Sequence, residues 1–410
     1  MNDLGLRAIS VLGLGVMIGI AWLASTDRKR VPWRSVAWGV GIQLALGVLL
    51  LKTGAGQLFF AGVKVGVDKL LAYTQAGTRF MFGPLLESGF SFALGVLPII
   101  VFMGSVFAIL YHLGWIQVVV TALARMLSRS MRLSGAESLA AVANIFVGMV
   151  ESCLVIKPYI ERMTRSELFS TMTVGMATVA GSVLLAYVSI LGGGDFAGHL
   201  VTASLLSAPA GLLMAKIIVP ETGVPETRVG ARALVDRSTV NVIDAAAEGA
   251  RNGLRLAAYV GAMLVAFVAL IAMLNDALAA LGGWVGYPEL SLELMLGTLL
   301  APLALVMGVP WADAVDVGGL LGVKTVLNEF IAYQQLGDHI AAGELSQRSR
   351  VIASYALCGF ANFGSLAILL GGIGGMAPSR RHEVASLGLR SILAGSLATF
   401  MTGCVAGIML

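Results

Sequence analysis

Residues 316–333 read DVGGLLGVKTVLNEFIAY, and the interpretation of the whole chain starts from this stretch. It places Lys324, Asn328 and Glu329 in a run that is otherwise apolar enough for a bilayer. A carboxylate at membrane depth is costly unless it faces a partner or a cavity, so such a residue usually marks the path of a solute or an ion. Two structural alternatives stay open: an interfacial turn whose charges reach water, and a Lys324–Glu329 ion pair that only holds helices together.

The composition of the chain is that of a polytopic membrane protein. Of its 410 residues, 58% are hydrophobic and 12% are charged, and the mean hydropathy is +0.89. Apolar runs about as long as a bilayer is thick alternate with short charged stretches, a pattern typical of membrane-spanning helices. The net charge of +4 is too small and too scattered to indicate nucleic-acid binding. Cys153, Cys358 and Cys404 lie in apolar segments without a metal-binding or disulfide spacing.

We predict an all-α membrane protein with eight transmembrane helices, two re-entrant hairpins and interfacial helices. The spans are expected at residues 8–25, 35–51, 93–112, 168–191, 197–219, 256–282, 351–370 and 386–409. Interfacial helices are expected at 56–80, 117–131 and 291–308. Basic clusters mark the cytoplasmic loops, as at residues 28–30, 125–132 and 380–381. This arrangement places both termini outside.

Two segments read as hairpins that enter and leave the membrane on one side. Residues 134–163 are apolar but interrupted by Asn144, Gly148 and Glu151, and basic residues follow closely at the end. The stretch around Glu329 forms the second hairpin, which enters from the outside. Non-helical backbone at such a tip is tolerated only where protein or a water-filled cavity covers it.

A short sequence echo suggests that the chain contains an inverted repeat. Residues 175–183 read GMATVAGSV after the first hairpin, and residues 359–366 read GFANFGSL after the second. Each unit has three full spans, and an odd number turns the second copy upside down, as in secondary transporters. Small-residue packing could also produce the echo by chance. The predicted divisions are 1–92 for the N-terminal helices, 93–219 for the first repeat, 220–255 for a cytoplasmic loop and 256–410 for the second repeat.

The predicted loop 220–255 is the most polar part of the chain. It carries Arg228, Arg232, Arg237, Arg251 and Arg255. An excess of arginine is expected on the cytoplasmic side of a membrane protein.

The side chains near the second hairpin suggest a substrate with hydroxyl groups. Glu329 can accept two hydroxyl hydrogen bonds at once, and Asn362 and Ser365 add a donor and acceptors. This combination suits the vicinal diol of a sugar.

The first hairpin and the span after it carry groups that could bind a cation. Hard cations need several oxygen ligands, which Asn144, Thr178 and freed carbonyls of Val147 and Val179 could supply. A proton carrier would instead use an ionisable group such as Glu151 or Glu329.

Six motifs in register resemble the concentrative nucleoside transporter family. They are ANIFVGMVE at 143–151, GMATVAGS at 175–182, VPW at 309–311, GVKTVLNEFIAY at 322–333, ALCGFANFGS at 356–365 and MAPSR at 376–380. The resemblance covers about residues 25–410. It implies a homotrimer with spans three and six as scaffold, and an elevator-like movement of the remaining transport domain. It also implies inward transport of nucleosides with sodium or, in some members, with protons.

The resemblance assigns roles to individual residues. The ribose would be held by Glu329, Asn362 and Ser365, and Phe360 would pack on the nucleoside. The tip of the first hairpin and the following span would face the base through Gly148, Met149, Val150, Glu151 and Val183. The sodium ligands would be Asn144 and Thr178 with the carbonyls of Val147 and Val179. Proton-coupled relatives tend to lack this asparagine, which favours sodium.

The tip of the first hairpin departs from the family pattern. The family usually has Gly-Gln-Thr-Glu or Gly-Gln-Ser-Glu, whereas residues 148–151 read GMVE. Met149 and Val150 cannot make the side-chain hydrogen bonds of glutamine and threonine, and methionine offers an adaptable apolar surface. We expect ribose recognition to survive and base recognition to become promiscuous, purine-leaning or directed to another riboside. The apolar Val183 agrees with this expectation.

The sequence therefore predicts a sodium-coupled symporter that imports nucleosides across the cytoplasmic (inner) membrane, with lipid around it and without a cofactor. A proton-coupled carrier of a different or modified riboside is the alternative. An intramembrane enzyme that uses Glu151 and Glu329 as an acid/base pair would lack a histidine or cysteine partner. A sensor that binds without translocating is a further alternative. Lys324 is expected either to pair with Glu329 or to lie near water at the hairpin base.

Overall fold

A computed structural model describes residues 3–88, 91–228, 231, 239–284 and 286–410, and every regular element in these ranges is a helix. Seven helical segments are long and apolar enough to cross a membrane: Asp3–Leu23, Trp33–Lys52, Phe92–His112, Arg165–Ile190, Gly194–Ile218, Val242–Trp284 and Pro378–Met409. The remaining predicted span, 351–370, is divided into two shorter helices by the non-helical residues 358–362. The predicted all-α polytopic fold class is confirmed.

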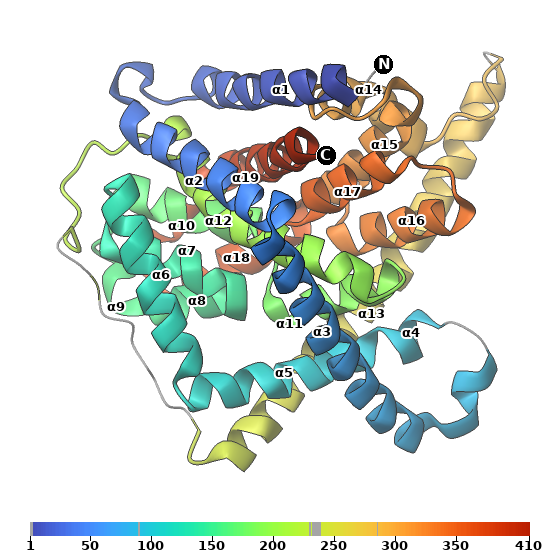
Figure 1. The fold of residues 1–410 in the computed structure, drawn as a ribbon, viewed down its shortest axis with the longest axis horizontal. Helices are drawn as coiled ribbons and strands as arrows, with labels where there is room; N and C mark the ends of the chain where they lie inside the picture. Colours follow the sequence, from blue (N-terminus) through green and yellow to red (C-terminus); the bar gives the residue numbers. More distant parts are fainter. Residues whose placement is uncertain (1–2, 89–90, 229–230, 232–238, 285) are drawn as a thin grey trace.

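The N-terminal part consists of three long helices. They are α1 (Asp3–Leu23), α2 (Trp33–Lys52) and α3 (Gly54–Phe82), with the short helices η1 (Arg28–Arg30) and η2 (Gly83–Ser88). The α3 helix begins after Thr53 because the threonine hydroxyl accepts a hydrogen bond from the backbone N–H of Gly56. It runs diagonally across the front of the molecule in Figure 1. Most of its residues are exposed, as expected for the predicted interfacial helix.

The rest of the chain contains two series of helices in the same order. The first series is α4 (Phe92–Gly95), α5 (Leu97–His112), α6 (Trp115–Met131), α7 (Gly135–Val147), α8 (Met149–Val155), α9 (Lys157–Ile160), α10 (Arg165–Ala177), α11 (Gly181–Ile190), η3 (Gly194–Phe196) and α12 (Ala197–Ile218). The second is α13 (Val242–Trp284), α14 (Leu292–Val306), η4 (Trp311–Asp313), α15 (Ala314–Val326), α16 (Glu329–Ala342), α17 (Gln347–Leu357), α18 (Phe363–Met376), η5 (Pro378–Arg380) and α19 (Arg381–Met409). Each series runs span, connecting helix, hairpin, interrupted helix and span, as the sequence echo predicts.

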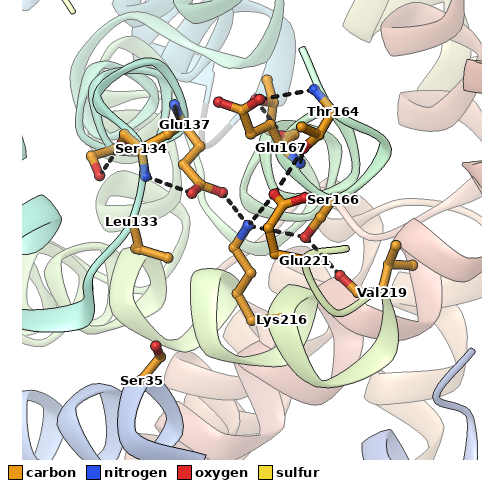
Figure 2. A network of polar contacts seen from close by, with 12 residues as sticks. Ser35, Leu133, Ser134, Glu137, Thr164, Ser166, Glu167, Lys216, Val219 and Glu221 are labelled. Atoms are coloured by element: carbon orange, nitrogen blue, oxygen red, sulfur yellow. Dashed lines mark hydrogen bonds and ion pairs between the residues drawn. The ribbon is translucent and has the colours of Figure 1, made fainter. Parts of the chain in front are cut away.

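Side-chain caps fix the bases of the first hairpin and of the interrupted helix that follows it. Ser134 and Glu137 form a reciprocal capping box at the start of α7, and Thr164 and Glu167 form another at the start of α10. Lys216, from the end of α12, places its ammonium group 2.8 Å from the Glu137 carboxylate, and both side chains are buried. Figure 2 shows this ammonium group between the two capped helix ends. The same ammonium group donates to the Ser166 hydroxyl of α10 over 3.0 Å, so Lys216 joins three helices at one point.

Two packing regions organise the helices. The α12 and α19 helices are almost wholly buried and pack on each other and on α10, while α19 also packs on α17. By contrast, α5 packs closely on α13. Their backbones approach so closely that a Cβ atom at Gly249 would lie 2.4 Å from the Gly104 carbonyl oxygen. Most of α13 is exposed. Both ends of the chain lie close together (Figure 1), where the Arg7 guanidinium donates to the Leu410 carbonyl over 2.5 Å.

The predicted loop 220–255 is helical in its second part. The α13 helix begins at Val242, where the Asn241 side chain accepts a hydrogen bond from the Asp244 N–H over 2.9 Å. Hydropathy marks where a span enters the membrane, whereas alanine, glutamate and arginine allow the helix to continue beyond it. Arg251 and Arg255 therefore lie on α13, and Arg232 and Arg237 lie outside the described residues.

Candidate functional site

The hairpin tips and the helix interruptions meet around one cavity of about 190 Å³. Hairpin 1 (α7 and α8) turns at Gly148, whose φ of +103° is a conformation that favours glycine. Hairpin 2 (α15 and α16) turns at Asn328, which caps α16 by accepting from the Ile331 N–H over 2.9 Å. The broken helices α10–α11 and α17–α18 line the same cavity at their interruptions. This is the arrangement that the repeated sequence predicts.

All nine residues predicted to contact the substrate line this cavity. They are Gly148, Met149, Val150, Glu151, Val183, Glu329, Phe360, Asn362 and Ser365. Their roles toward a ligand stay predictions, but the fold brings together side chains separated by more than half of the sequence.

The Glu329 carboxylate is the most strongly bonded acid at the cavity. It is 4% exposed; one oxygen accepts from the Tyr187 hydroxyl over 3.0 Å, and the other accepts from the Asn362 amide over 2.8 Å. The Asn362 side-chain oxygen in turn accepts from the Ser365 N–H over 2.7 Å, which caps α18. These bonds hold the carboxylate in one orientation, and each oxygen keeps a further lone pair for a ligand hydroxyl.

The part of the cavity wall formed by Met149 and Val150, at the tip of hairpin 1, is apolar. Met149 is 8% exposed, and Val150 packs against α18, since a side chain at Gly372 would lie 3.0 Å from its methyl groups. Glu151 lines the cavity with an exposed side chain. A ligand here would meet carbon and sulfur at positions 149 and 150 rather than hydrogen-bonding groups.

Several cavity residues were missed by the sequence reasoning. Asn328 and Phe330 flank Glu329, and Ser182 precedes Val183, so adjacency alone could have indicated them. Tyr187 does not line the cavity itself but orients Glu329 from one helical turn after Val183, and the apolar sequence of α11 gives no sign of that role. Tyr259 and Met263 come from α13, where nothing in the apolar sequence distinguishes the face toward the cavity.

The predicted sodium ligands lie behind the tip of hairpin 1. The Asn144 amide nitrogen donates to the Val174 carbonyl over 3.0 Å and to the Thr178 hydroxyl. Its side-chain oxygen is buried and has no hydrogen-bond donor among the described residues. Of the four predicted sodium ligands, Val147 lines the cavity, whereas Asn144, Thr178 and Val179 do not line it. An unpaired buried oxygen beside an interrupted helix fits a cation that takes oxygen ligands.

Lys324 takes neither of the positions expected from the sequence. It is fully buried, which excludes a place near water, and its ammonium group makes no ion pair with Glu329. The ammonium group donates instead to the Ala356 carbonyl and to the Thr399 hydroxyl, each over 2.7 Å. Hairpin 2 is therefore attached through Lys324 to α17 and α19.

Three family models match the chain in succession. Residues 12–85 match the Na+ dependent nucleoside transporter N-terminus, 93–194 match the nucleoside recognition (Gate) model, and 199–407 match the Na+ dependent nucleoside transporter C-terminus. The chain belongs to the concentrative nucleoside transporter family. The predicted resemblance is confirmed, and the protein is a transporter rather than an enzyme.

Relatives in the concentrative nucleoside transporter family match along almost all of this chain. The nucleoside permease NupC of Helicobacter pylori is 40% identical over 97% of this chain and 97% of that protein. The uncharacterized transporter YutK of Bacillus subtilis is 46% identical over 97% and 98%. Solute carrier family 28 member 3 of Rattus norvegicus is 43% identical, but the match spans 59% of its length. A solved structure of CNTnw in an inward-facing substrate-bound state is 45% identical over 98% of each chain, with a TM-score of 0.92.

Proposed function

We propose that this transporter imports nucleosides together with sodium, and that the ribose binds between hairpin 2 and α18. The observation that carries the proposal is the Glu329 carboxylate, which Tyr187 and Asn362 orient toward the cavity. Two ribose hydroxyls can share one carboxylate, while Ser365 supplies a further hydroxyl.

The base would face the apolar tip of hairpin 1. Met149 and Val150 supply no side-chain donor or acceptor, so the contacts with the base edge would be mainly apolar. Loss of polar contacts reduces discrimination between bases, because a wrong base no longer leaves a buried polar group unpaired. We therefore propose base recognition that is promiscuous, leans toward purines or is directed to another riboside.

Sodium would bind at Asn144, Thr178 and the carbonyls of Val147 and Val179. The unpaired buried oxygen of Asn144 supports this site, because a cation would supply the missing partner. The family models that match the two ends of the chain carry sodium dependence in their descriptions. A proton would not need this oxygen but would use Glu151 or Glu329.

The proposed assembly is a homotrimer in the cytoplasmic membrane with both termini outside. The α5–α13 pair would be the scaffold, since α13 packs closely on α5 and exposes most of its remaining apolar surface to lipid or to a second protomer. The α10, α12, α17 and α19 helices would move with the hairpins as the transport domain in an elevator mechanism. Their mutual burial supports movement as one body.

Uptake into proteoliposomes tests the proposal. Labelled uridine and adenosine are offered to the full-length protein under an inward sodium gradient, an inward proton gradient or none. Accumulation driven by sodium, with a broad or purine-leaning preference, is the expected result. Accumulation driven only by protons would overturn sodium coupling. Strict preference for uridine or cytidine would overturn the altered base site. Uptake of neither compound would mean that this chain shares the architecture of the family but does not transport these nucleosides.

A further inference from the structure

Lys324 has a buried amino group, and this group makes no ion pair with a carboxylate among the described residues. The exposed fraction of Lys324 is 0%. The Phe400 ring lies 5.7 Å from its ammonium nitrogen, a distance typical of a cation–π contact. A positive charge on a buried group is costly unless other groups stabilise it, so the contacts of this amino group show what would hold a charge there.

The ammonium group stabilises the end of α17 where the helix is interrupted. The last four carbonyls of a helix have no partner inside it. At the end of α17, neighbouring groups donate hydrogen bonds to three of these carbonyls. The Ser354 carbonyl accepts from the Tyr333 hydroxyl, the Tyr355 carbonyl accepts from the Cys358 N–H, and the Leu357 carbonyl accepts from the Gly359 N–H. The fourth carbonyl, that of Ala356, accepts from Lys324 over 2.7 Å. A positive charge is also favourable here because the C-terminal end of a helix is the negative end of its dipole.

The same place in the first repeat is occupied by Asn144. Asn144 lies four residues before Gly148 at the tip of hairpin 1, and Lys324 lies four residues before Asn328 at the tip of hairpin 2. Each side chain reaches from the first arm of its hairpin to a carbonyl in the last turn of the next interrupted helix, Val174 or Ala356. Asn144 is neutral and keeps one side-chain oxygen unpaired among the described residues, whereas Lys324 supplies an amino group that can carry the charge itself.

We propose that the Lys324 ammonium group is a tethered cation, and that it does in the second repeat what the proposed sodium ion does in the first. It links hairpin 2, which carries Glu329, to the interrupted helix α17 without a free ion. The coupling ion then binds only in the first repeat. This assignment rests on the sodium site proposed above for its comparison, but the role of Lys324 at α17 can be measured separately.

Chemical rescue tests the proposal. In full-length protein in lipid nanodiscs, Lys324→Ala should weaken nucleoside binding by about ten- to a hundredfold, because a charge-assisted contact between hairpin 2 and α17 is lost. Propylammonium, which replaces the removed part of the side chain, should restore much of the affinity, and propanol, which has similar size but no charge, should not. Binding is measured by titration calorimetry.

Three further measurements make the result decisive. Lys324→Met keeps all but one heavy atom of the side chain and should lose affinity as the alanine variant does, which separates the loss of the amino group from the loss of side-chain volume. The exposed Lys157→Ala should respond to neither additive. Equal rescue by propanol, or unchanged affinity in Lys324→Met, would overturn the proposal. Sodium-independent uptake by the unaltered protein would overturn the proposed sodium coupling but not the rescue.

Discussion

The Asn362 amide donates a 2.8 Å hydrogen bond to the Glu329 carboxylate, and this contact joins the tip of hairpin 2 to the start of α18. Glu329→Gln should weaken nucleoside binding by about ten- to a hundredfold, since its amide nitrogen cannot accept the bonds that a carboxylate oxygen accepts. Calorimetry in nanodiscs and the KM of uptake measure the effect. The exposed Glu289→Gln is the matched control, and equal affinity in both variants would contradict the ribose assignment.

The buried oxygen of Asn144 leads to a prediction about the ion. Asn144→Ala and Thr178→Val should each raise the sodium concentration for half-maximal uptake by about tenfold or more, because ligand number sets the affinity of oxygen sites. Thr173→Val serves as the control, since this buried hydroxyl has no partner among the described residues. An unchanged sodium dependence in both test variants would remove the proposed site.

The polar residues inside apolar runs made much of the cavity predictable. Glu151, Glu329 and Asn362 stand out in sequence because lipid excludes such groups unless the fold covers them. The odd number of spans per repeat then predicted that both hairpins meet. These inferences depend only on the free-energy cost of burying polar groups and on the odd number of spans in each repeat.

The contacts that orient the site could not be predicted in this way. Tyr187 and Tyr259 sit in apolar helices, where the sequence does not tell a face toward a cavity from a face toward lipid. The partner of Lys324 depends on how α15 packs against α17 and α19, a tertiary relationship without a local signal. The start of α13 at Val242 was missed because hydropathy reports membrane depth rather than helix ends.

The apolar tip of hairpin 1 predicts a gain of selectivity on substitution. The double variant Met149→Gln/Val150→Thr restores the polar residues usual in the family, and it should shift the ratio of uridine to adenosine affinity by about tenfold, since it supplies two hydrogen-bonding groups at the cavity. Competition binding against labelled nucleosides measures the ratio. Met149→Leu/Val150→Ile is the apolar control. An equal ratio in both double variants would show that these positions do not face the base.

The buried Lys216–Glu137 pair predicts a large loss of stability (Figure 2). Lys216→Met leaves the Glu137 carboxylate without its cation and should destabilise the protein by about 3–5 kcal/mol. Adding Glu137→Gln should recover part of the loss, because the neutral amide can still accept from the Ser134 N–H. Melting temperatures of the two single variants and the double variant form a cycle. Additive losses would show that the two charges do not interact.

Asp313 predicts a pH dependence at the base of hairpin 2, outside the membrane-spanning segments. Burial by itself would raise the pKa of its carboxyl group, but hydrogen bonds from Ser349 and Ser346 outweigh it and lower the pKa. A carboxyl group whose pKa is lower in the folded state stabilises that state above its unfolded pKa, and the contribution is lost as the pH falls through the folded value.

Asp313→Asn should therefore lower the melting temperature at pH 7 and approach the unaltered protein below about pH 4, near the ordinary aspartate pKa. At neutral pH the variant loses charge-assisted bonds worth about 1.5–3 kcal/mol each before compensation, whereas in acid the carboxyl group is itself protonated. Melting curves across this range measure the difference, with the exposed Asp338→Asn as the control. A difference from the unaltered protein that stays constant with pH would mean that Asp313 acts through shape rather than charge.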